Sequence, residues 1–250
     1  MGYTHVVRSG RAAKTMTIDR FQTPLYNVAE ASRYLGVSDS TFRAWANGYV
    51  RHSSGRQDVH GEPIVTTIEG QPRGAALIPF VGLAEGLVLA GIRKSGVPLQ
   101  RIRPALDRLQ EEFGLKHVLA SHRLYADGAE VLYDFGRDSD DGGDVMRLVV
   151  VRNGQHVFTE VVQQYLKRIE FAADGYANVI HLPSYERAQV VVNPQRGFGQ
   201  PTFARGGARV EDVLGMFWAG ESLATASAEY GVPEDQLEDA LRVASRKTAA

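Results

Sequence analysis

The segment from Tyr26 to Gly48, YNVAEASRYLGVSDSTFRAWANG, constrains the fold more than any other part of the chain. Asn27, with Glu30 three residues later, matches a capping box at the start of a first helix. Gly36 can adopt the positive φ that ends this helix, and Ser38 can cap a second one. The pattern therefore predicts two short helices joined by a tight turn, which is a helix-turn-helix.

The second of these helices has two different sides. Phe42 and Trp45 are three residues apart and would anchor it on the first helix. The opposite side carries small or hydrogen-bonding residues and one arginine, which is the chemistry that reads base edges and phosphates in the major groove of DNA. The DNA-binding residues expected on this basis, with three arginines of the next segment, are Ser38, Ser40, Thr41, Arg43, Ala44, Asn47, Arg51, Arg56 and Arg73. The alternative is an ordinary helical hairpin with a buried tryptophan.

Residues 49–79 are rich in glycine and proline. Two short β-type runs, Pro63–Ile68 and Ala75–Ile78, are joined by a turn-rich segment, and this pattern predicts a hairpin. A hairpin directly after a helix-turn-helix is a wing. We expect its arginines to touch the DNA backbone beside the major groove.

Two apolar helices are predicted next, over residues 80–96 and from Pro98 to about Phe113. They carry more apolar surface than a small winged domain needs. We expect this surface to form a homodimer interface, because DNA readers commonly match a two-fold operator. The expected interface residues are Leu83, Leu87, Ile102 and Leu106. The alternative is that the surface packs only against other parts of the same chain.

The rest of the chain has weaker patterns. Residues 115–144 are predicted to be loop-rich. The aspartate run around Gly142-Gly143 lacks the spacing of a calcium loop, and we expect it to be a solvated turn. A strand over 145–151, a helix and further short strands follow. After Asn193-Pro194 come a glycine-rich loop and three short helices, whose surface carries Glu221, Glu229, Glu234, Asp235, Glu238 and Asp239.

Composition limits the possible functions. The 250 residues include no cysteine, which excludes disulfides, thiolate metal sites and thiol catalysis and fits a reducing cytoplasm. We expect a cytoplasmic protein, since no secretory signal or membrane-spanning stretch is visible. The net charge is −1, but residues 1–60 hold eight Lys/Arg against four Asp/Glu, so positive charge accompanies the helix-turn-helix.

Catalytic patterns are weak by comparison. The seven histidines are scattered, and no Ser-His-Asp order, metal-ligand cluster or phosphate loop stands out. We therefore expect a binding protein rather than an enzyme, with no cofactor and no metal.

Two stretches resemble known families. YNVAEASRYLGVSDSTFRAW resembles the MerR-like winged helix, and residues 80–114 are similar to what often follows it. The stretch from Val191 to Leu241 is similar to a small trihelical bacterial family of unknown function, through Gly199-Gln200-Pro201, Ala219 to Ser222 and Tyr230 to Glu234. One departure is Gly206-Gly207-Ala208-Arg209, where that family usually has Gly-Thr-Arg. The whole chain resembles an antitoxin of the VapB type with an added N-terminal reader.

The resemblance implies a function that the residues alone do not. It implies an antitoxin that neutralises a PIN-domain ribonuclease toxin and regulates its own transcription at operator DNA. An inserted arginine could displace the charge of the metal in such a ribonuclease. The candidates are Arg196, Arg205, Arg209 and Arg242, for which the alternative is loop solvation or charge pairing on a helix. A MerR-like regulator that responds to a small effector and has no toxin partner remains the other hypothesis.

The expected fold is mainly α with small β-hairpins. The expected divisions are a flexible tail at 1–20, a winged helix-turn-helix at 21–79, a helical dimerisation region at 80–125, an α+β connector at 126–192 and a trihelical domain at 193–250.

Overall fold

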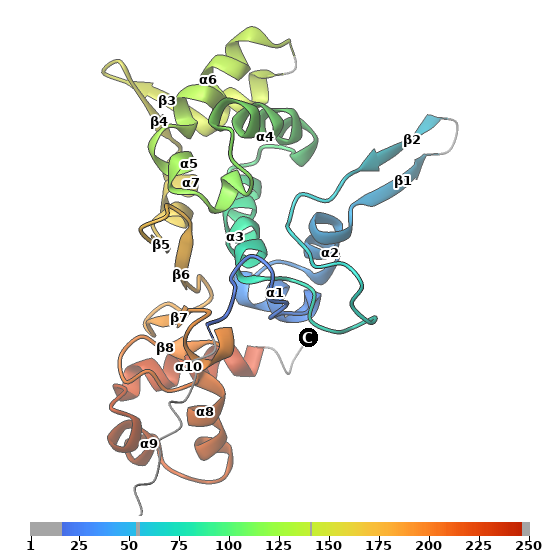
Figure 1. The fold of residues 1–250 in the computed structure, drawn as a ribbon. Coiled ribbons are helices and arrows are strands. Elements are labelled where there is room, and N and C mark those ends of the chain that lie inside the picture. Colours follow the sequence, from blue (N-terminus) through green and yellow to red (C-terminus); the bar gives the residue numbers. More distant parts are fainter. Residues whose placement is uncertain (1–16, 54–55, 141, 247–250) are drawn as a thin grey trace, which may run out of the picture.

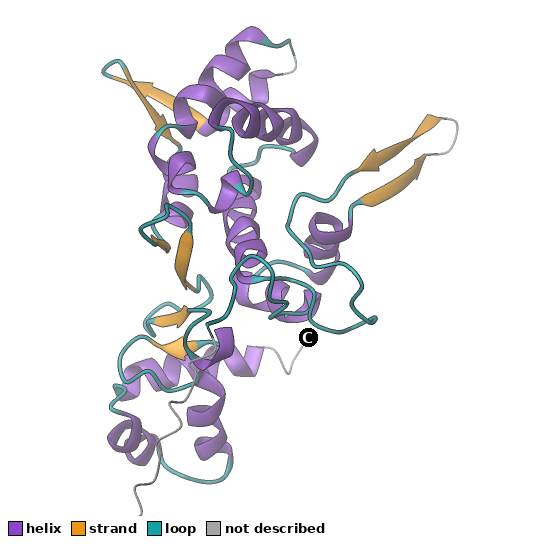
Figure 2. Ribbon diagram, viewed as in Figure 1, coloured by secondary structure: helices purple, strands orange, loops and turns teal. Residues whose placement is uncertain are grey.

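The computed structural model describes residues 17–53, 56–140 and 142–246, and within these ranges the side chains of 51–59 and of residue 246 lie outside the description. The fold is mainly helical with three small antiparallel sheets, as the sequence predicted (Figure 2). Residues 1–16 of the expected tail lie outside the described part. Residues 18–20 are packed, since Ile18 and Gln195 exchange hydrogen bonds of 3.1 and 2.7 Å and Arg20 pairs with Asp174.

The chain begins with the predicted helix pair and continues into a hairpin. The elements are α1 (Val28–Leu35), α2 (Asp39–Asn47), β1 (Tyr49–Ser53) and β2 (Arg56–Gly61). The hairpin projects away from the rest of the molecule (Figure 1). Tyr49 pairs with Gly61 across it, and a Cβ at Gly61 would collide with the Tyr49 ring.

The predicted wing was therefore placed in the wrong segment, because residues 62–79 form no hairpin. Their apolar residues attach this loop to the helix-turn-helix instead. Ile64 and Val65 donate backbone hydrogen bonds to the Trp45 carbonyl at 2.8 and 3.1 Å, and Ile78 pairs with Tyr26 in an isolated bridge. The sequences of the observed strands, YVRHS and RQDVHG, lack the regular alternation of apolar and polar residues by which a strand is recognised.

A long central helix organises the molecule. This helix is α3 (Phe80–Lys94), and residues 80–92 are all buried in it. Neighbouring segments lie close to three of its glycines. A Cβ at Gly82 would collide with the Thr66 carbonyl. A Cβ at Gly86 would lie 2.6 Å from Phe42, and one at Gly91 would lie 2.8 Å from Tyr165. Because glycine has no side chain, neighbouring elements can approach the helix closely at these positions.

The four residues expected at a dimer interface are buried within the fold of a single chain. Leu83, Leu87 and Ile102 are 0% exposed and Leu106 is 6% exposed. Helix α4 (Leu99–Phe113) packs with α6 (Gly128–Asp138), and α3 packs with α7 (Glu160–Leu166). The intramolecular alternative is what the structure shows, and these side chains offer no surface to a second copy.

The segment expected to be loop-rich is largely helical, which corrects the sequence analysis. After α4 the chain forms η1 (Val118–Ala120), α5 (His122–Ala126), α6 and η2 (Gly142–Leu148). This segment contains Gly128 and Gly136. Both are buried in α6, where a Cβ at Gly136 would collide with Met146, so they are packing contacts rather than helix breakers.

Two further sheets link the middle of the chain to its C-terminal part. The first pairs β3 (Val149–Arg152) with β4 (Gln155–Phe158), and the second has the order β5 (Ile169–Phe171), β6 (Ala177–His181), β7 (Val190–Val192), β8 (Thr202–Phe203). The expected boundary at Asn193 falls between β7 and β8. Strand pairing crosses it, so residues 193–250 share a sheet with the connector.

The last three helices confirm the expected trihelical unit. They are α8 (Val210–Trp218), α9 (Leu223–Tyr230) and α10 (Glu234–Arg246), and they lie at the opposite end of the molecule from α4 and α6 (Figure 1). One acidic residue assigned to the surface of this unit is buried. Asp239 is 5% exposed, and its Oδ2 accepts hydrogen bonds from the N–H groups of Glu186, Arg187 and Ala188 at 2.8–2.9 Å.

Candidate nucleic-acid interface

The caps of the helix-turn-helix are formed as the sequence predicts. The Asn27 side chain accepts from the Glu30 N–H and the Glu30 carboxylate accepts from the Asn27 N–H, both at 2.9 Å. Gly36 takes φ 68° and ends α1, and Ser38 caps α2. Phe42 and Trp45 are 0% and 1% exposed, and their rings meet edge to face at 6.0 Å. The position of α2 is thus fixed by caps at its start and by aromatic packing beneath it.

A buried carboxylate fixes the loop that follows the hairpin. Glu85 of α3 is 3% exposed and accepts hydrogen bonds from the N–H and the hydroxyl of Thr66, at 2.6 and 3.0 Å. Its Oε1 also lies 3.1 Å from Nδ1 of His117. These bonds satisfy polar atoms that would otherwise be costly to bury, and they hold residues 62–79 against the central helix.

The predicted reading face of α2 is open. Ser38, Ser40, Arg43 and Asn47 are exposed, and Thr41 and Ala44 are partly exposed. Two hollows of about 730 Å³ each border this face. The first is lined by Ser40, Thr41, Ala44, Tyr49 and the start of α4; the second contains Arg43 and Asn47 beside the exposed Arg73 of the loop 67–77. The structure therefore brings the predicted residues of α2 and Arg73 together on one ridge and its flanks. Arg51 and Arg56 lie on the hairpin strands, and their side chains are outside the described part.

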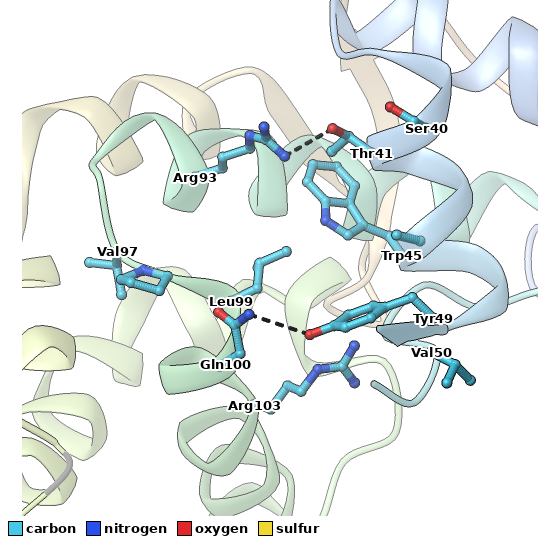
Figure 3. A pocket seen from close by; sticks show the side chains of 12 residues that line it. Ser40, Thr41, Trp45, Tyr49, Val50, Arg93, Val97, Leu99, Gln100 and Arg103 are labelled. Carbon is cyan, nitrogen blue, oxygen red and sulfur yellow. Dashed lines mark hydrogen bonds between the residues drawn. The ribbon is translucent and has the colours of Figure 1, made fainter. Parts of the chain in front are cut away.

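Three polar residues of the first hollow were not predicted from the sequence. Arg93, at the end of α3, donates from Nη1 to the Thr41 hydroxyl at 2.9 Å (Figure 3). Gln100 donates to the Tyr49 hydroxyl at 3.5 Å, and the Arg103 guanidinium lies 6.0 Å from the centre of the Tyr49 ring. The sequence signal that points to them is the group of basic residues on both sides of the helix break at Gly96 to Pro98.

The four candidate toxin-binding arginines differ in their surroundings. Arg209 forms two hydrogen bonds with Asp212 at 2.9 and 3.0 Å, which raise the pKa of its guanidinium, and Arg242 pairs with Glu238 at 2.9 Å. Charge pairing, the alternative left open for these residues, therefore describes both. Arg196 and Arg205 are exposed and make no side-chain hydrogen bond or ion pair within the described residues.

The N-terminal and C-terminal parts touch directly. The buried Tyr26 hydroxyl donates to the Gly199 carbonyl at 2.9 Å, and the Tyr34 hydroxyl donates to Oε1 of Gln200 at 3.0 Å. A recess of about 340 Å³ lies beside these contacts, between α1 and α8, and its lining includes Arg33 and Trp218. The loop that carries Arg196 is therefore seated on the helix-turn-helix domain.

Residues 17–53, 56–140 and 142–246 lack two further kinds of feature. No helix there combines the length and the apolar character needed to cross a membrane. The same residues include no group of three histidine, aspartate or glutamate side chains placed to hold a metal ion.

Comparison with known proteins agrees with this two-part organisation. Residues 24–106 match a family described as "Putative DNA-binding HTH domain", and residues 190–244 match one described as "Protein of unknown function (DUF433)". The first match covers α1 to α4 as far as residue 106, so it includes the arginines of both hollows. The second begins at β7, which agrees with the pairing of β7 and β8.

Whole-chain relatives are found in Mycobacterium tuberculosis. "Putative antitoxin VapB45" is 48% identical over 226 residues, which cover 89% of this chain and 94% of that protein. "Uncharacterized protein Rv2308" is 31% identical over 239 residues, covering 91% of each. The crystal structure of Rv2018 superposes with a TM-score of 0.79 at 46% identity, covering 89% of this chain and 99% of that one. With this identity over nearly the full length of both proteins, the chain belongs to the VapB45 antitoxin family.

Proposed function

We propose that this chain is an antitoxin that binds operator DNA through α2, represses its own transcription and neutralises a PIN-domain ribonuclease. The observation that carries the DNA-binding part is the exposed ridge of α2, which lies between two hollows containing Arg43 and Arg73 on one side and Arg93 and Arg103 on the other. A recognition helix in the major groove has a phosphate backbone on each side of it, so arginines on both flanks suit that position.

The toxin part of the proposal rests on the kinship with VapB45. Within the C-terminal part, Arg196 and Arg205 are the arginines best suited to meet an acidic site, since they are exposed and unpaired within the described residues. Arg209 and Arg242 would first have to leave their carboxylate partners. The chain would then act by occlusion and charge, as a binding protein of the cytoplasm.

A homodimer is part of the proposal because operators are commonly two-fold symmetric. Its interface must lie outside Leu83, Leu87, Ile102 and Leu106, which are buried within one chain. Equilibrium sedimentation at micromolar concentration should give twice the 27.4 kDa of the monomer. A clean monomer would remove the dimer from the proposal.

Two experiments test the function as a whole. Gel-shift titration at fixed salt should show the purified chain binding the DNA upstream of its own gene more tightly than unrelated DNA. Co-expression with the ribonuclease encoded by the neighbouring gene should restore growth. DNA binding without any rescue would favour the effector-responsive regulator.

A further inference from the structure

The turn between β7 and β8 contains three consecutive residues with positive φ. Gly197, Phe198 and Gly199 have φ of 54°, 53° and 75°. Glycine adopts this conformation freely, whereas a residue with a Cβ does so at a cost in free energy. Phe198 is one of three non-glycine residues with positive φ in the described part of the chain. Its backbone is therefore strained, and the surroundings must maintain that strain.

Those surroundings are well ordered by hydrogen bonds. Gly199 donates to the Arg196 carbonyl at 3.0 Å, and the buried Tyr26 hydroxyl donates to the Gly199 carbonyl at 2.9 Å. A Cβ at Gly199 would lie 2.6 Å from that hydroxyl, so the turn is pressed closely against Tyr26. Gln195 adds two hydrogen bonds to the backbone of Ile18. Contacts with Tyr26 and Ile18 therefore restrain the turn.

The strained backbone conformation does not bury the Phe198 side chain. Phe198 is 76% exposed, the highest value among the large hydrophobic side chains of the described residues. Arg196, two positions earlier, is also exposed and is unpaired in the same part of the chain. An exposed aromatic ring and an arginine on a restrained turn are the composition of an interface hot spot, and restraint reduces the entropy lost on binding.

We propose that Phe198 and Arg196 form a preorganised anchor that inserts into an apolar recess with acidic residues on its rim, on the surface of the ribonuclease partner. This inference rests on the proposed function. Arg196 makes the anchor complementary to an acidic protein. DNA is a less favourable partner for the anchor. The Arg209 side chain borders Gly197 and is paired with Glu211 and Asp212, and these carboxylates repel phosphate.

The test measures binding of the full chain to the ribonuclease encoded by the neighbouring gene, by calorimetry. Phe198→Ala should weaken binding at least tenfold and Arg196→Ala about fivefold. Two matched controls, Tyr125→Ala and Arg152→Ala, alter an exposed aromatic and an exposed arginine elsewhere and should change affinity less than about twofold.

Phe198→Gly separates binding from folding. It removes the ring and relieves the positive φ, so the thermal midpoint should stay equal or rise while affinity falls as in Phe198→Ala. If the wild-type chain and both Phe198 variants bind the ribonuclease with the same affinity, the inference is overturned and the proposed function remains intact. A wild-type chain that does not bind the ribonuclease would overturn both.

Two other outcomes assign the anchor elsewhere and also overturn the inference. If Phe198→Ala leaves ribonuclease binding unchanged but converts a dimer to a monomer in sedimentation, the anchor serves a second copy of the chain. If it leaves ribonuclease binding unchanged but weakens operator binding, the anchor serves DNA.

Discussion

The helix pairs α1–α2 and α9–α10 show how one backbone arrangement carries two different surfaces. In each pair the first helix ends at a glycine with positive φ, Gly36 at 68° and Gly231 at 65°, and a valine follows before the second helix begins. The exposed face of α2 presents serine, arginine and asparagine. That of α10 presents Glu234, Asp235 and Glu238. The two pairs therefore share a backbone arrangement and differ in the charge of the second helix.

The two pairs also differ in what fixes the second helix. Helix α2 is anchored by the buried side chains of Phe42 and Trp45, and Phe42 lies against Gly86 of α3. Helix α10 buries Leu237 and Ala240 in the core and also carries a buried carboxylate, Asp239, which accepts hydrogen bonds from three backbone N–H groups of residues 186–188. Apolar packing tolerates small changes, whereas a buried polar cap fails when its acceptor is lost. The predictions below test this difference and the difference in surface.

The largest effect is expected at Asp239. Asp239→Ala should lower the free energy of unfolding by about 3 kcal/mol, because it leaves buried N–H groups without an acceptor. Urea denaturation measures this loss, and operator affinity of the folded fraction should be unchanged. An effect below about 1 kcal/mol would show that the cap contributes little.

Asp239 also predicts a dependence on acid. Burial alone raises the pKa of this carboxyl, but the hydrogen bonds from Ala188, Arg187 and Glu186 hold it below its usual value. Its contribution to stability is therefore complete above about pH 4, the ordinary aspartate pKa, and is lost as the pH falls through the lower folded-state pKa. Asp239→Asn should lack this component of the acid unfolding curve.

The next effect concerns the two second helices directly. Arg43→Ala should weaken operator binding by about 2 kcal/mol, or roughly thirtyfold in Kd, if the guanidinium contacts a base. Arg242→Ala removes an arginine from the matching helix α10 and is the control, with little change expected. Equal losses in the two variants would mean that the chain binds DNA through general positive charge.

A smaller effect is expected at the contact between α3 and the loop 62–79. Gly82→Ala puts a methyl group against the Thr66 carbonyl, which cannot move freely because Glu85 holds the Thr66 side chain and N–H. We expect a net loss of about 1.5 kcal/mol, since the overpacking exceeds the gain in helix propensity. Thermal unfolding measures it, and an unchanged midpoint would show that the loop yields.

The smallest effect has the opposite sign and lies in the C-terminal part. Gly215, within α8, has nothing within 4 Å of the position a Cβ would take. Gly215→Ala should therefore stabilise the chain by about 0.5–1 kcal/mol through helix propensity alone. A loss of ribonuclease binding in this stable variant would locate part of the partner surface on α8.

Local rules were enough to predict the elements whose residues act on their own neighbours. The capping box, Gly36 and the Ser38 cap predicted α1 and α2, because caps and turns are satisfied within a few residues. The same reasoning failed for the wing at 63–78. One backbone hydrogen bond, from Ile68 to Leu77, joins the two β-type runs, but Ile64, Val65 and Ile78 bond to Trp45 and Tyr26 instead. Strand pairing between distant segments has no local signature.

The sequence by itself determined the helix-turn-helix, the trihelical C-terminal unit and the open face of α2, since each follows from short-range periodicity and caps. Only the tertiary structure decided which apolar and charged residues remained available. It buried Leu83 and Leu87 inside the chain, placed Arg93 beside Thr41, and turned Asp239 into an internal cap. Exposure depends on which distant surfaces meet, and those contacts are set by the packing of the whole chain.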